Sequence, residues 1–114
     1  MAVLFYEKAV PATSSGNEDL AGYAGETVHY EPEGLAPRLF EVFSTDDFSA
    51  GTLVVTLYKN GVAVEGAALT LDDTTQRAAV ELVGVGYGPG DRMTVGWVST
   101  SLAPTTADLV AVVS

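Results

Sequence analysis

The alternation of apolar and polar residues predicts a chain built from short β-strands. In TLVVTLY, Leu53, Val55 and Leu57 fall on one face of an extended strand, because successive side chains of a strand point to opposite sides. An apolar spacing near two recurs along the chain, and no stretch keeps the period of a helix. About eight strands are expected, at residues 2–10, 27–31, 38–43 (with a bulge), 52–58, from 62 to the turn at 72, 77–85, 92–100 and 108–113.

The clearest turn signal is Asn60-Gly61. A two-residue type I′ turn needs positive φ at both central positions, and Asn followed by Gly meets that need best. We therefore predict a hairpin that joins residues 52–58 to a strand starting at Val62. Residues 11–26 are rich in Pro, Gly, Ser, Asn and Asp, which is typical of a surface loop.

Several predicted strands carry apolar residues on both faces. In residues 52–58, Val54 and Tyr58 lie opposite the Leu53 face, and the N-terminal MAVLFY is apolar on both sides as well. One face fills the core, and the simplest cover for the second is a partner subunit. We predict an all-β, single-domain antiparallel β-sandwich of the jelly-roll type over residues 1–114, in which residues 1–26 form either an ordinary first strand with a loop or a docking arm.

Composition narrows the class of protein. The 114 residues suit one domain, and 47% hydrophobic with 18% charged residues is too apolar for a disordered chain. No cysteine is present, which excludes disulfides and thiolate metal sites. MAVLFYEKAV lacks a basic start and a long apolar run, so we expect neither a secretory signal nor a membrane span.

The formal net charge of −10 also bears on partners. Fifteen acidic residues against five basic ones repel nucleic acid and anionic lipid, so neither is expected as a partner. The same charge either serves solubility or lets an acidic face dock on a basic partner.

The pieces VTLYKNGVAV, AAVELVGVGYGPGDRMTVGWV and DLVAVV carry a resemblance to a known family. From Thr52 to the end, the chain resembles the second half of the tumour-necrosis-factor-like and complement-globular-head-like jelly rolls. It also resembles small acidic virion proteins of tailed phages, namely capsid decoration (cement) proteins and fibre-head domains. This resemblance implies a homotrimer that is made in the host cytoplasm, binds the major capsid protein or another virion protein, and resides on the capsid surface.

Residues that could carry chemistry are few. His29 is the only histidine and no Gly-x-Ser-x-Gly is present, so we predict no enzyme and assign no catalytic residue. The carboxylate pairs could serve glycoside hydrolysis or bind calcium, although paired Asp in turns more often cap amides or face water. These pairs are Asp46-Asp47, Asp72-Asp73 and Glu31 with Glu33. We assign no metal-ligating residue.

The glycine-rich GVGYGPGD and the aromatic residues complete the candidates. The G-x-G-x-G-x-G spacing of GVGYGPGD indicates turn geometry rather than a phosphate loop, and we assign no cofactor. Trp97 shares a face with Val95 and Met93, so it is expected to be buried. Tyr87 lies in a turn and is expected to be exposed, as a possible glycan contact; Tyr23, Tyr30 and Tyr58 are further candidates.

The sequence therefore leaves two functions from different classes open. The first is a structural virion protein, a trimeric capsid decoration protein that stabilises a phage capsid. The alternative is a fibre-tip or accessory binding module that recognises a glycan or receptor.

Overall fold

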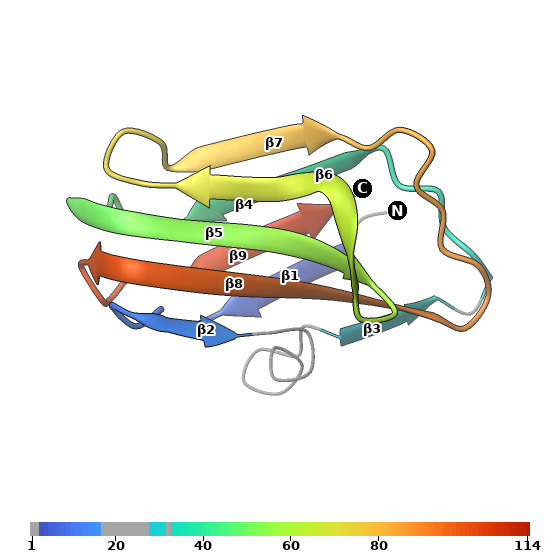
Figure 1. Cartoon of the computed structure of the whole chain (residues 1–114), viewed down its shortest axis with the longest axis horizontal. Helices are drawn as coiled ribbons and strands as arrows, with labels where there is room; N and C mark the ends of the chain where they lie inside the picture. The colour runs from blue at the N-terminus through green and yellow to red at the C-terminus, as the bar shows by residue number, and fades with distance from the viewer. Residues whose placement is uncertain (1–2, 17–27, 32) are drawn as a thin grey trace.

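A computed structural model describes residues 3–16, 28–31 and 33–114, and within these ranges the protein is built from strands (Figure 1). No helix in the described ranges is long and apolar enough to cross a membrane. The described residues form nine strands: β1 (Val3–Glu7), β2 (Ser14–Gly16), β3 (Val28–Glu31), β4 (Leu39–Ser44), β5 (Ala50–Lys59), β6 (Val62–Leu71), β7 (Arg77–Glu81), β8 (Asp91–Ala103) and β9 (Leu109–Val113).

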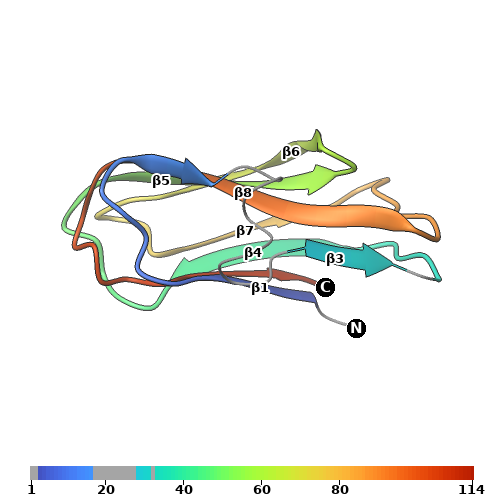
Figure 2. The ribbon, with the colours of Figure 1, turned by 90° about the horizontal axis from the view of Figure 1, so that it is seen from below.

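The strands form two antiparallel sheets packed face to face, as seen from the side in Figure 2. One sheet has the order β1-β9-β4-β7; we call it the front sheet, although it lies behind the other sheet in the view of Figure 1. The other has the order β2-β8-β5-β6, with β3 also paired to β8, and we call it the back sheet. The predicted all-β antiparallel sandwich is thereby confirmed.

The sheet order follows from one long hairpin. Asn60 and Gly61 adopt φ of 50° and 81°, as the predicted turn requires, and they join β5 to β6. Moving outward from this turn, β4 pairs with β7, β3 and β2 pair with β8, and β1 pairs with β9. Lateral pairing of β5 with β8 and of β4 with β9 joins these pairs into the two sheets, which gives the wrapped connectivity of a jelly roll.

The core lies between the sheets and uses the alternation read from the sequence. Leu53, Val55 and Leu57 of β5 are fully buried, and Trp97 of β8 is 7% exposed, which confirms its predicted burial. Phe40 and other residues of the front sheet meet them from the opposite side. Burial of each such side chain contributes about 1.5–3 kcal/mol relative to exposure.

The strands differ from the sequence prediction in several places. The first strand ends at Glu7 rather than at residue 10, and Ser14–Gly16, within the predicted loop 11–26, form β2 beside β8. The expected bulge in residues 38–43 is wrong, because β4 keeps a continuous register with both neighbours. Apolar residues occupy both faces of β4, so the out-of-step spacing of Leu39 and Val42 did not indicate a bulge. The strand expected at 77–85 ends at Glu81, and β8 continues to Ala103, beyond the predicted end at 100.

The real irregularities of pairing lie along β5. Its register against β6 shifts between Thr56 and Tyr58, and β6 bends sharply there in Figure 1. Its register against β8 shifts between Ala50 and Thr52, opposite Ser101, which has a φ of 48°. Gly51 lies at this second shift with a φ of 82°, and a Cβ placed on it would be 2.3 Å from the Ser101 carbonyl oxygen.

We expect Gly51→Ala to destabilise the fold much more than Gly66→Ala. Both glycines have positive φ, but a Cβ on Gly66 would meet nothing within 4 Å. Gly66→Ala should therefore cost only the backbone strain, about 1–2 kcal/mol. Gly51→Ala adds a backbone clash and a forced shift, about a further 1–3 kcal/mol. Urea unfolding curves measure both losses, and equal losses would contradict the assigned contact with Ser101.

Candidate functional site

The outer face of the front sheet carries apolar side chains from several of its strands. Alternation places Phe5, Ala111 and Val42 toward the core, so their neighbours in sequence point outward. Register aligns the outward residues of the four strands in two rows. These rows are Leu4–Val112–Glu41–Ala79 and Tyr6–Val110–Phe43–Arg77.

The apolar members of this front face are covered to different degrees. Leu4 is 62% exposed, whereas Val110 is only 8% exposed although it lies outside the core cluster. Val112 and Phe43 are half-buried. The exposed Leu4 and its cross-strand neighbour Val112 thus form an apolar surface at the β1 edge of this face.

The charges within the two rows neutralise each other. Arg77 donates to Glu41 through Nη2 at 2.9 Å and through Nε at 3.2 Å, a two-point contact. Its guanidinium also lies over the Phe43 ring, 5.3 Å from the centroid. The bond from Arg77 holds the pKa of Glu41 below its ordinary value. The front face therefore carries no net charge in these rows.

A second group of contacts anchors β1, which contributes Leu4 to this face. The Tyr6 hydroxyl donates to the Asp108 carboxylate, which also accepts the Ala9 amide at 2.8 Å. These bonds, the one from Tyr6 foremost, hold the pKa of Asp108 below its usual range. The Asp108 backbone amide donates to the Thr45 hydroxyl oxygen at 2.9 Å, and the Asp108 carbonyl accepts the Thr45 amide at 3.0 Å. The end of β1 is thus tied to the end of β4 and the start of β9.

The outer face of the back sheet also carries apolar residues. Val54, Thr56 and Tyr58 of β5 are half-buried there, and Val98 beside them is 51% exposed. From the sequence, residues 52–58 are the clearest strand with apolar residues on both faces. The structure shows that β9 and β4 carry a second apolar face as well, which the two-sided runs DLVAVV and RLFEVF could have indicated.

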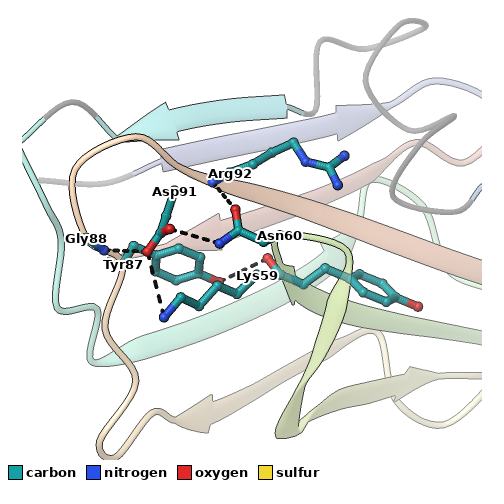
Figure 3. Close-up of polar contacts among 7 residues, drawn as sticks. Lys59, Asn60, Tyr87, Gly88, Asp91 and Arg92 are labelled. Atoms are coloured by element: carbon teal, nitrogen blue, oxygen red, sulfur yellow. Dashed lines mark hydrogen bonds and ion pairs between the residues drawn. The ribbon is translucent and has the colours of Figure 1, made fainter.

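The far end of the β5–β6 hairpin is held to the start of β8 by a polar cluster (Figure 3). Asn60 donates from Nδ2 to Asp91 at 2.8 Å and accepts the Arg92 amide on Oδ1 at 2.8 Å. Asp91 also accepts the Gly88 amide at 2.6 Å, and Lys59 Nζ lies 3.7 Å from it. We call these five residues the tip clasp. The bonds from Asn60 and Gly88, then the charge of Lys59, hold the pKa of Asp91 below its ordinary value.

Tyr87 was expected to be exposed, and this is wrong: it is 2% exposed. Its backbone exchanges two 2.7 Å hydrogen bonds with Leu35, and its hydroxyl donates to the Tyr58 carbonyl at 3.1 Å. Burial, the largest cause, and the nearby Asp91 raise its pKa.

The other candidate residues are dispersed. Asp72 accepts the amides of Thr74 and Thr75 at 2.9 and 2.8 Å, which is the turn-capping role. Asp46, Asp47 and Glu33 are exposed. Among the described residues, no three His, Cys, Asp or Glu side chains are grouped so that they could hold a metal ion.

Some candidates lie beyond what the structure describes. β3 places the backbone of His29 opposite Met93 and that of Tyr30 opposite Arg92, but the side chains of β3 are outside the described part. Tyr23 lies outside the described residues, as do residues 1–2 and 17–26 of the proposed arm.

Comparison with known proteins adds no relative. No protein-family model matches the chain, and no curated protein is significantly similar to it.

We expect Asp91→Asn to lower the melting temperature at pH 7, and the loss to fade in acid. The folded protein holds the pKa of Asp91 below that of the unfolded chain, so the folded state binds fewer protons. The stability from this group is present above the unfolded pKa of about 4 and is lost as the pH falls through the lower folded pKa. Below that pH the carboxyl is neutral like the amide, so the two proteins should melt together.

Asp73→Asn is the matched control, because it removes one negative charge from an exposed turn residue. It should leave the melting temperature at pH 7 nearly unchanged. Thermal unfolding followed by circular dichroism between pH 7 and pH 3 tests both variants. A wild-type advantage over Asp91→Asn that stays constant across this range would show that ionised Asp91 does not stabilise the tip.

Proposed function

We propose that this protein is a structural, non-catalytic virion protein that assembles as a homotrimer and decorates a phage capsid. The observation that supports this proposal best is the front face, which is apolar in two aligned rows and has its charges paired as Glu41 with Arg77. A rigid two-layer sandwich is suited to hold such a face in a fixed shape.

Net charge favours this face for contact between copies. A chain with a formal charge of −10 repels another copy of itself, and an interface can form only where that repulsion is weak. Burying an unpaired carboxylate would add a further cost. The front face avoids both, because Leu4, Val112, Tyr6 and Val110 carry no charge at neutral pH. Contact between copies through it would cover the exposed Leu4.

A trimer is proposed from the resemblance of the second half of the chain to trimeric jelly rolls. The nested strand pairing agrees with a fold of that class, although fold alone does not fix function. Closed threefold symmetry repeats one modest interface three times and leaves no growing end. Three linked copies would also bind a shell more tightly than one copy by avidity.

The glycan-binding alternative receives no support from the described residues. It rested first on an exposed Tyr87. This side chain, which belongs to the β7–β8 connection, is buried and donates to the Tyr58 carbonyl. Capsid decoration therefore remains the proposal, with the acidic turns facing solvent.

We expect a solution mass of about 35 kDa, three times the 11.8 kDa of one chain. Leu4→Glu should shift this mass to that of a single chain, because it buries a charge in the proposed interface. Val98→Glu is the matched control on the back sheet and should leave the trimer intact. Light scattering coupled to size exclusion measures the three masses, with circular dichroism to confirm folding.

The outcomes distinguish two questions: whether the protein forms a trimer, and which face forms the interface. A monomeric wild type at micromolar concentration would overturn the proposed trimer. A trimeric Leu4→Glu with a monomeric Val98→Glu would move the interface to the back sheet.

The capsid location is a separate prediction. Quantitative mass spectrometry of purified virions should find this chain at a copy number divisible by three, and shells stripped of it should lose thermal stability. Its absence from purified virions would overturn the location, whatever its oligomeric state.

A further inference from the structure

The tip clasp holds an asparagine with an unusual chemical neighbour. Asn60 precedes Gly61, whose backbone nitrogen is unshielded because glycine has no Cβ. An asparagine in this setting can lose its side-chain amide by attack of the next backbone nitrogen. Asn60 is also exposed, so water reaches it.

The contacts of Asn60 oppose that reaction. Its Nδ2 donates to Asp91 and its Oδ1 accepts the Arg92 amide, each at 2.8 Å, so both ends of the amide point at the start of β8 (Figure 3). The Asn60 backbone amide adds a third bond, to the Arg92 carbonyl at 2.9 Å. The side chain therefore cannot turn toward the Gly61 nitrogen without giving up two hydrogen bonds.

We propose that Asn60 is a modification site, that the tip clasp keeps it unreactive, and that its conversion to aspartate opens the clasp irreversibly. In the first step the Gly61 nitrogen bonds to Asn60 Cγ, the Cγ–Nδ2 bond breaks, and the amide nitrogen leaves as ammonia with the proton from Gly61. Water then opens the five-membered ring at either carbonyl, giving aspartate or isoaspartate. The overall reaction consumes one water and releases one ammonia.

The products no longer fit the clasp. An aspartate at position 60 has no N–H to donate, so a second carboxylate would face Asp91 at hydrogen-bonding distance. Two like charges that close disfavour ionisation of both. An isoaspartate would add a methylene to the backbone of a two-residue turn whose φ angles are fixed at 50° and 81°. Either product separates the hairpin tip from β8.

This opening would act on a surface beside the clasp. A groove of about 220 Å³ lies between the start of β6 and residues 84–86, and Lys59 of the clasp lines it. The two walls belong to the two segments that the clasp joins, namely the β5–β6 hairpin and the β7–β8 connection. Conversion of Asn60 would therefore change the shape of this groove with the age of the molecule. The inference is independent of the proposed trimer.

The first test measures the rate of conversion by peptide mass spectrometry in mildly alkaline buffer. We expect the folded wild type to convert at least about tenfold more slowly than the urea-unfolded chain, because two hydrogen bonds must break first. Asp91→Ala, which removes the acceptor of Nδ2, should convert faster than wild type, and Asp73→Ala should match wild type. Equal rates for the folded and unfolded chains, or for Asp91→Ala and wild type, would overturn the protective role.

The second test uses variants that need no reaction. Asn60→Asp reproduces one product, and Asn60→Gly removes the same hydrogen bonds without adding charge in a turn position that glycine tolerates. At pH 7, hydrogen exchange at the Gly88 and Arg92 amides should be fastest in Asn60→Asp. Exchange as slow as in the wild type would show that the product leaves the clasp closed.

Discussion

The antiparallel pairing of one half of the chain with the other, around the turn at Asn60-Gly61, is the constraint on which the remaining structure depends. Each strand before the turn has its partner after it, at increasing distance in sequence. The turn sets the register of β5 against β6, and the outer pairs must be compatible with it. Since a shift by one residue would exchange the buried and exposed faces, this register also decides which side chains form the core.

The same constraint explains why the tip carries the densest polar contacts. A long hairpin that wraps around itself brings its turn against strands far away in sequence, here the start of β8. The Asn60 side chain continues the β5–β8 ladder past the end of β5, and Asp91 contacts three cationic or hydrogen-bonding donors, from Lys59, Asn60 and Gly88. Tyr87 is buried beside these contacts, and its bonds with Leu35 and Tyr58 hold the β7–β8 connection in place.

Much of the fold could be predicted from the sequence, because local patterns decide it. The hairpin at Asn60, the buried Leu53 face and the burial of Trp97 follow from turn chemistry and alternation. The burial of Tyr87 could not be predicted, because it depends on contact with Leu35 and Tyr58, which are distant in sequence. The expected bulge at 38–43 failed because residues on both faces of β4 are apolar, and their phase then carries no information about the side that faces the core.

The front face was foreseen only in part. Two-sided apolar strands predicted that some second surface needs cover, but sequence alone could not show which strands become neighbours. Leu4 and Val112 are more than a hundred residues apart and meet only because β1 pairs with β9. The Glu41–Arg77 pair is likewise a product of register between β4 and β7, and it pairs the one charge of the first row with the one charge of the second.

The shift of register near the start of β6 has a consequence for crowded surroundings. β6 is the last strand of the back sheet, so its outer backbone groups have no neighbouring strand of that sheet. A straight, uncharged border of this length would invite strands of other molecules to join it and propagate fibres. The bend at residues 64–67, with Glu65 exposed and Gly66 at a φ of 78°, breaks that border into short pieces. A molecule shaped in this way can be held at high local concentration without strand pairing between its sheets and those of its neighbours.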